Sequence, residues 1–195
     1  HLFETSEKSL SRWKKSYKRM LQEIAYYNGP ERTLLLKNPH NTARVKVLKE
    51  MFPNAKFIFI HRNPYDVYKS TEHLYKKTIK SQFLQKFSDE EISECVISCY
   101  ELVMKQYLDL KKFIPENQLT EVSFNDLSNN PLSTIECIYR TLNIAGFEKI
   151  KPSFESYIQD QKNYRKNKFI ELPEELKSKL KERWGFAFKA WNYPH

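Results

Sequence analysis

The chain has 195 residues, enough for one globular domain, and we treat residues 1–195 as a single domain. Hydrophobic residues make up 40% of it and aromatic residues 14%, which excludes a disordered chain, and no apolar run reaches the roughly 20 residues of a membrane span. The formal net charge of +9 favours an anionic ligand or surface without saying which one.

The first part of the chain alternates helical and strand-like patterns. Apolar side chains recur every three or four residues from about residue 8 to residue 28, which predicts an amphipathic helix that an Asn-Gly-Pro sequence ends. Two apolar runs of strand length follow, at residues 33–37 and 56–61, and residues 39–52 between them show helical spacing. We therefore expect a strand–helix–strand unit with parallel strands and a right-handed crossover.

Helices dominate the rest of the chain. A helix is predicted from about residue 64 to residue 78, and Ser88 and Glu91 form a capping box that opens another long helix. A strand is predicted at residues 119–124, a helix at residues 131–142, and helical patches after it. This alternation predicts an α/β fold, with a parallel sheet that carries helices on both faces.

The three cysteines, Cys95, Cys99 and Cys137, are odd in number and lack the CxxC spacing of a metal site. Cys95 and Cys99 fall on the apolar side of the helix that follows Ser88, so we expect them to be small core residues. A reducing compartment is indicated. Because the first ten residues lack the layout of a secretory signal, we expect a cytoplasmic protein.

Both early strands end in a basic residue followed by Asn-Pro, and the basic residues are Lys37 and Arg62. Asn favours the N-cap of a helix and Pro its first position, so each cation lies beside a helix N-terminus, where free N–H groups are expected. Ligands of open α/β sheets bind past the carboxyl ends of the strands. Arg62 can grip a phosphate with two bonds, and Ser70, two turns into the following helix, can add a donor.

The Asn-Pro sequence itself is not specific to a ligand site. Asn130-Pro131 starts a further predicted helix with no basic strand end before it. Asn-Pro is therefore this chain's ordinary way of starting a helix, and any specificity resides in Arg62 and Ser70.

Four segments taken together, LLLKNPHNTARVKVLKEMFPNAKFIFIHRNPYDVYKST, EVSFNDLSNNPLSTIECIYRTLNI, NYRKNKF and RWGFAFKAWNYP, resemble the bacterial sulfotransferase family. The similarity runs over almost the whole chain from about Trp13. It implies a P-loop nucleoside-kinase-like fold and transfer of a sulfuryl group from 3′-phosphoadenosine 5′-phosphosulfate to a hydroxyl or amine acceptor. The product would be 3′-phosphoadenosine 5′-phosphate, and no metal would be required.

The resemblance also implies roles for individual residues. Arg62 and Ser70 match the family's 3′-phosphate ligands. Lys37 matches a lysine whose charge could stabilise the sulfuryl group in transfer. His40 lies near the position of a histidine general base, although the bacterial pattern usually has its histidine one position later, where this chain has Asn41.

Two further segments carry over less directly. Arg165 and Lys168 belong to a basic segment of the kind that closes over the 3′-phosphate near the C-terminus of sulfotransferases, and a solvated surface is the alternative for such a charge run. The family's Tyr-Glu-Asp-Leu sequence begins here at Phe124, without the tyrosine hydroxyl and with Asn125 in place of the carboxylate. The segment therefore departs from the family pattern at both positions.

An N-terminal strand and loop that hold the 5′-phosphosulfate in sulfotransferases have no candidate before Leu34. With only three glycines, the chain contains neither GxGxxG nor GxxxxGK(S/T). We therefore expect a C-terminal portion of a sulfotransferase, incomplete at its N-terminus, whose missing part lies upstream or on a second chain. This portion would supply the 3′-phosphate site.

Other functions stay open at this stage. The charge alone is compatible with a non-catalytic module that binds adenosine bisphosphate or a polyanion, and the fold with a nucleotide kinase. Acidic residues are mixed with Lys and Arg along the helices, which argues against nucleic acid as the partner. The acceptor, whether a small molecule, a carbohydrate or a lipid, is not indicated by the sequence.

Overall fold

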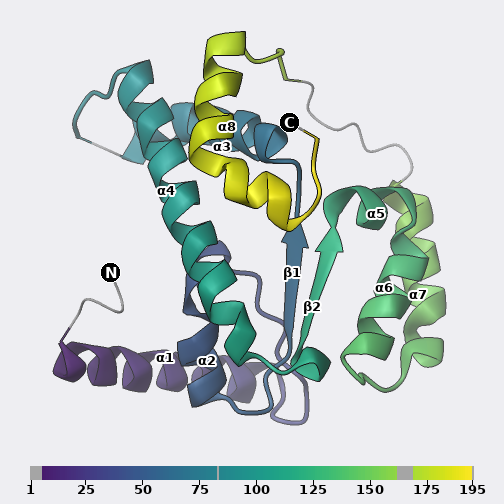
Figure 1. Cartoon of the computed structure of the whole chain (residues 1–195). Coiled ribbons are helices and arrows are strands. Elements are labelled where there is room, and N and C mark those ends of the chain that lie inside the picture. Colours follow the sequence, from purple (N-terminus) through teal and green to yellow (C-terminus); the bar gives the residue numbers. More distant parts are fainter. Residues whose placement is uncertain (1–5, 83, 162–168, 195) are drawn as a thin grey trace.

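The computed structural model describes residues 6–82, 84–161 and 169–194 (Figure 1). In chain order, the helices and strands are α1 (Glu7–Asn28), α2 (Val45–Met51), β1 (Phe57–His61), α3 (Pro64–Gln82), α4 (Asp89–Leu110), β2 (Leu119–Ser123), α5 (Phe124–Asn129), α6 (Pro131–Thr141), α7 (Phe147–Asp160) and α8 (Glu174–Ala190). Short 3₁₀ turns cover Pro39–Arg44 (η1), Lys111–Phe113 (η2) and Glu116–Gln118 (η3). None of the helices in these ranges is long and apolar enough to cross a membrane.

The two strands lie side by side in parallel, which confirms the predicted parallel sheet (Figure 1). The expected strand–helix–strand unit of residues 33–37 and 56–61 is not formed, because β1 pairs with β2 instead. Their register runs from Phe57 opposite Leu119 to His61 opposite Ser123. Because the strands end at the same level, the starts of α3 and α5 lie at one edge of the sheet. That edge is where an open α/β sheet binds its ligands.

The strand expected at residues 33–37 is not formed, and this prediction was wrong. The residues lie in an extended segment without helix or strand, and the Leu35 side chain is 88% exposed. The physical reason is the lack of a neighbour, since the described part of the chain contains a sheet of two strands only. An apolar run becomes a strand only when another strand satisfies its backbone groups.

A first core cluster joins α3, α4 and α8. Its fully or almost fully buried members are Tyr68, Val96, Ile97, Leu180, Trp184 and Phe188. The indole Nε1 of Trp184 donates a hydrogen bond of 3.0 Å to the Ile97 carbonyl, so its polar atom is satisfied inside the core. The predicted aromatic C-terminal stretch is therefore the main packing element of α8.

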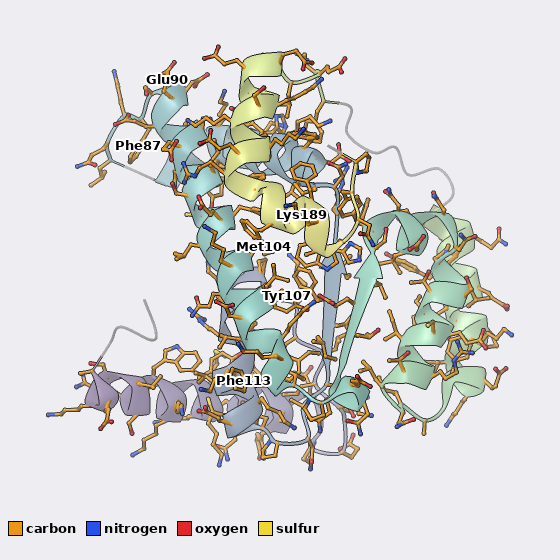
Figure 2. All side chains as sticks on the ribbon, in the orientation of Figure 1. Phe87, Glu90, Met104, Tyr107, Phe113 and Lys189 are labelled. Carbon is orange, nitrogen blue, oxygen red and sulfur yellow. The ribbon has the colours of Figure 1, made fainter. Side chains whose placement is uncertain are left out.

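A second cluster covers one face of β1. Val45, Tyr107 and Ile114 form its buried part and pack against Phe57 and Phe59. Tyr107, labelled in Figure 2, comes from α4 and lies between that helix and the strands. The opposite face of β1 is different, because Ile58 is 41% exposed and Ile60 48% exposed. Helices thus cover only part of the second face in the ranges that the structure describes.

Cys95 and Cys99 are exposed, so the expectation that they are core residues was wrong. Helix α4 begins at the predicted capping box of Ser88 and Glu91. Its buried face carries Ile92 and Tyr107 as expected, but between them it is Val96 and Ile97, not Cys95 and Cys99, that point into the core. A shift of one residue turns a side chain by about 100° on a helix, which is enough to exchange core for surface.

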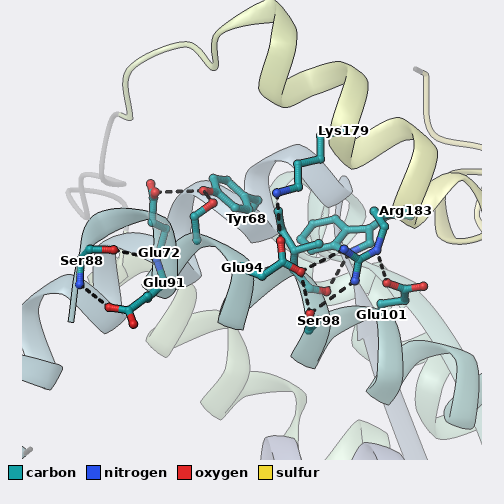
Figure 3. A network of polar contacts seen from close by, with 12 residues as sticks. Tyr68, Glu72, Ser88, Glu91, Glu94, Ser98, Glu101, Lys179 and Arg183 are labelled. Atoms are coloured by element: carbon teal, nitrogen blue, oxygen red, sulfur yellow. Dashed lines mark hydrogen bonds and ion pairs between the residues drawn. The ribbon is translucent and has the colours of Figure 1, made fainter. Parts of the chain in front are cut away.

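An ionic network fastens α8 to α4 at the surface (Figure 3). Arg183 contacts Glu94 at 3.0 Å and Glu101 at 2.5 Å, and Lys179 contacts Glu94 at 2.9 Å. Hydrogen bonds from Lys179 and Arg183 lower the pKa of the Glu94 carboxyl to about 2. This network fixes the direction in which α8 delivers the C-terminal tail to the strands.

Candidate functional site

The candidate site lies at the carboxyl ends of β1 and β2. Arg62 follows β1 directly, and Phe124 begins α5 directly after β2. The guanidinium carbon of Arg62 lies 4.8 Å from the centre of the Phe124 ring, a cation–π arrangement. The residue that replaces the family's tyrosine thus supports Arg62 with its ring face. Sequence reasoning missed this contact because it looked for the absent hydroxyl.

Arg62 has an unsatisfied donor. Its Nε atom is buried and has no hydrogen-bond partner, and the nearest carboxylate oxygen, Oδ2 of Asp66, is 3.6 Å away. That distance is too long for a hydrogen bond. Asp66 instead holds Lys69, whose Nζ is 2.9 Å from the other carboxylate oxygen. Buried donors are nearly always paired, so this unpaired guanidinium nitrogen marks Arg62 as a candidate ligand-binding residue.

The start of α3 does not offer the free N–H groups that the Asn-Pro pattern predicted. Pro64 has no N–H, and the Tyr65 amide donates to the Asn63 side-chain oxygen at 2.9 Å. The Asp66 and Val67 amides both donate to the Asn63 carbonyl at 3.0 Å. The Val67 bond is the first regular bond of the helix, and the Tyr65 and Asp66 amides before it are already paired with Asn63. Any anion here must be held by side chains.

Ser70 lies on α3, on the same helix face as Asp66, and is half-buried. A groove of about 550 Å³ runs beside this face, between the start of α3 and α8. Its lining includes Asn63, Asp66 and Lys69 from the α3 side and Lys177, Ser178, Lys181 and Pro194 from the α8 side. Glu171 and Glu174 also line the groove, and both pair with Lys177, so its lysines are matched by carboxylates. Arg62 and Ser70 are not part of the lining, although Asn63, next to Arg62, is.

Lys37 and His40 lie in another segment of the chain from Arg62 and Ser70, because Lys37 just precedes η1 and His40 belongs to it. Both are exposed, and the Asn38 side-chain oxygen accepts the His40 amide at 3.0 Å and contacts its Nδ1 at 3.2 Å. In the described ranges, no hydrogen bond or ion pair joins either residue to Arg62 or Ser70. Arg165 and Lys168 lie outside the described residues.

His61 and Tyr193 form a polar contact beside Arg62. The His61 Nδ1 and the Tyr193 hydroxyl are 2.8 Å apart, and the His61 ring stacks on Trp191 at 5.4 Å. Burial lowers the pKa of His61 below its ordinary value, although Glu121 and Asp126 act in the opposite direction. Burial likewise raises the pKa of Tyr193. His61 is therefore a neutral packing residue at the end of β1, in line with a structural role.

The lowered pKa of His61 makes stability depend on pH. Because protonation is harder in the folded state, the stabilisation is complete above the unfolded-state pKa of about 6.5 and is lost as the pH falls through it towards the lower folded value. We expect the free energy of unfolding to fall between pH 7.5 and pH 5.5, and to fall less steeply in His61→Gln. Urea unfolding at both pH values measures the free energy of unfolding. The same decrease between the two pH values in His61→Gln and in the unmodified protein would contradict the prediction.

No group of three or more His, Cys, Asp or Glu side chains in the described ranges is arranged to hold a metal ion. Arg62 and Phe124 meet where the parallel strands end, and Ser70 lies on the helix that follows Arg62. These features define an α/β protein with a candidate ligand site formed by side chains at its strand ends.

Comparison with known proteins gives the family. The sequence model of the sulfotransferase family matches residues 3–149, which is most of the chain. The chain belongs to the sulfotransferase family.

Relatives and solved structures agree with this assignment. The omega-hydroxy-beta-dihydromenaquinone-9 sulfotransferases Stf3 of Mycobacterium bovis and Mycobacterium tuberculosis are both 30% identical over 192 residues, which cover 98% of this chain and 49% of theirs. The chain thus spans about half the length of the curated relatives it matches. The crystal structure of sulfotransferase STF9 from Mycobacterium avium superposes with a TM-score of 0.63 at 15% identity, over 82% of this chain and 42% of that one. The α/β fold with a parallel sheet is therefore a sulfotransferase fold.

Proposed function

We propose that this chain supplies the 3′-phosphate site of a sulfotransferase that uses 3′-phosphoadenosine 5′-phosphosulfate as its donor. The observation that carries the proposal is the buried, unpaired Nε of Arg62 at the carboxyl end of β1. A phosphate oxygen would satisfy that donor with a charge-assisted bond, and the planar guanidinium can present a second N–H to the same phosphate.

The surroundings of Arg62 support an anionic ligand. The Phe124 ring holds the guanidinium from one side, and Lys69 draws the Asp66 carboxylate away from Nε. Ser70 would add a hydroxyl donor from the same helix face. The negative charge of Asp66 repels an anion. The phosphate would therefore bind to the Arg62 guanidinium and would leave the ion pair between Asp66 and Lys69 intact.

The reaction in the full-length protein needs further groups. A base would take the proton of an acceptor hydroxyl or amine while the acceptor atom attacks the sulfur. The bond from sulfur to the 5′-phosphate oxygen breaks, which leaves adenosine 3′,5′-bisphosphate. We assign the base to His40 and charge stabilisation of the moving sulfuryl group to Lys37, with Arg165 and Lys168 as further 3′-phosphate contacts.

Part of the active site would come from outside this chain. One edge of β1 pairs with β2, and the exposed Ile58 and Ile60 lie on a face that the described helices leave open. The extended segment with Leu35 and Leu36 is also exposed. We propose that a strand from the rest of the protein, or from a second chain, lies against these residues and brings the 5′-phosphosulfate site with it.

The acceptor is proposed from the relatives alone. Stf3 is named for omega-hydroxy-beta-dihydromenaquinone-9, a compound that carries a hydroxyl group. An acceptor hydroxyl is therefore favoured over an amine for this protein too.

Calorimetric titration tests the donor site. We expect adenosine 3′,5′-bisphosphate to bind about tenfold more tightly than adenosine 5′-monophosphate, because the 3′-phosphate adds at least one charge-assisted bond. Adenosine 2′,5′-bisphosphate has the same charge and serves as the control for non-specific attraction. Equal affinities for the two bisphosphates, or for the 3′,5′-bisphosphate and the monophosphate, would overturn the proposed 3′-phosphate site.

A further inference from the structure

The end of α8 determines the direction of the C-terminal tail that follows it. Asn192 has a positive φ of 53°, its amide donates to the Lys189 carbonyl at 3.4 Å, and the Tyr193 amide donates to the Phe188 carbonyl at 2.9 Å. This pair of bonds is a Schellman motif, in which a left-handed residue reverses the chain after a helix. The turn brings the tail beside the carboxyl end of β1 (Figure 1).

Tyr193 bridges the ends of the two strands. Its hydroxyl is 2.8 Å from the His61 Nδ1. Burial raises the pKa of Tyr193, and the Ser123 side chain lies close enough to the same hydroxyl to lower that pKa in part. His61 and Ser123 are opposite each other in the sheet register and form its last pair. A single phenol therefore ties β1, β2 and the tail together at the point where the strands end.

The next residue on each strand belongs to the candidate phosphate site. Arg62 follows His61, and Phe124 follows Ser123, and the Arg62 guanidinium lies 4.8 Å from the Phe124 ring centre. Any change in the spacing of His61 and Ser123 would change the spacing of Arg62 and Phe124, since only one peptide unit separates the two pairs. The Ser123 hydroxyl also caps α5 by accepting the Asn125 amide at 3.0 Å.

We propose that Tyr193 is a positioning residue of the phosphate site, which holds Arg62 and Phe124 at their observed spacing at the strand ends. The proposal rests on the proposed function of Arg62. It adds a role for the C-terminal tail. The Tyr193 hydroxyl acts through His61 and Ser123 and does not itself need to contact the ligand.

The test is calorimetric titration of Tyr193→Phe with adenosine 3′,5′-bisphosphate and adenosine 5′-monophosphate. The variant keeps the ring and loses the two hydroxyl contacts. We expect bisphosphate binding to weaken about three- to tenfold, the effect of one or two lost hydrogen bonds, while monophosphate binding stays unchanged. A purely structural residue would affect both nucleotides alike or neither, and either of those results would overturn the proposal.

The matched control is Tyr68→Phe. Its hydroxyl also has two partners, Glu72 at 2.9 Å and Ser93 at 2.7 Å, but these join α3 and α4 within the core. This variant should lower the melting temperature without changing the preference for the bisphosphate. If Tyr68→Phe lost the preference for the bisphosphate to the same extent, a general loss of stability would explain the effect, and Tyr193 would have no specific role. If the unmodified chain shows no preference, the proposed function fails before the role of Tyr193 is reached.

A second variant changes the tail without touching the hydroxyl. Asn192→Val places a β-branched residue at a positive φ and should disfavour the turn, whereas Asn192→Gly keeps it. We expect Asn192→Val to reduce the bisphosphate preference as Tyr193→Phe does, and Asn192→Gly to retain it. If the two Asn192 variants showed the same preference for the bisphosphate over the monophosphate, the turn at Asn192 would not be what positions Tyr193.

Discussion

Replacement of Arg62 by alanine is expected to weaken the binding of adenosine 3′,5′-bisphosphate about ten- to a hundredfold. The variant removes the buried Nε and the second guanidinium donor, and a hydrogen bond to a charged group is worth about 1.5–3 kcal/mol. Calorimetric titration measures the change. The Arg62→Lys variant keeps the charge but loses the planar fork, so its affinity should fall between those of the other two proteins.

The control for this experiment is Arg44→Ala. The Arg44 guanidinium lies 5.3 Å from the centre of the Trp13 ring, so it resembles Arg62 in stacking on an aromatic side chain, but it belongs to η1. Its loss should leave the affinity for the bisphosphate unchanged. Unchanged affinity in Arg62→Ala, or an equal decrease in both variants, would remove Arg62 from the phosphate site.

The largest loss of stability is expected for Trp184→Ala, at about 3–5 kcal/mol. Trp184 is completely buried between α3, α4 and α8, and its replacement leaves a cavity and removes the bond that its indole donates to the Ile97 carbonyl. Since a domain is stable by only about 5–15 kcal/mol, the variant would lie close to unfolding at room temperature. Urea denaturation followed by circular dichroism gives the free energy of unfolding directly.

A half-buried tryptophan provides the comparison. Trp13 on α1 stacks on Tyr17 at 5.0 Å and is only partly covered, so Trp13→Ala should destabilise the chain much less. Similar losses for the two variants would mean that the cluster around Trp184 is not the dominant core. A loss below about 1 kcal/mol for Trp184→Ala would contradict the packing described here.

The helices were predictable because their signals are local. The capping box at Ser88 and the Gly29 that ends α1 act within a few residues, and both are found where the sequence placed them. The two parallel strands were predictable for the same reason, from short runs of β-forming residues. Residues 33–37 show the limit of this reasoning, since a strand also needs a partner, and a partner is not written in the strand's own sequence.

The candidate site was predictable in part. Arg62 stands out because it follows a clear strand and precedes a helix start, both of which are local features. The contacts with Phe124 and Tyr193 depend on the register of β1 with β2 and on the direction of α8, which long-range packing determines. Asn192 was a readable signal, because an Asn after an aromatic helix end is a common left-handed cap.

The register of the sheet also determines how the chain folds. Phe57 and Leu119 meet only after a loop of about sixty residues has closed, and α3 and α4 lie within that loop. Helices form on the microsecond scale, whereas non-local strand pairing is slow, so we expect α4 to be in place before β2 docks on β1. Because Arg62 and Phe124 come together only with that docking, the ligand site is expected to be among the last parts of the molecule to assemble during refolding.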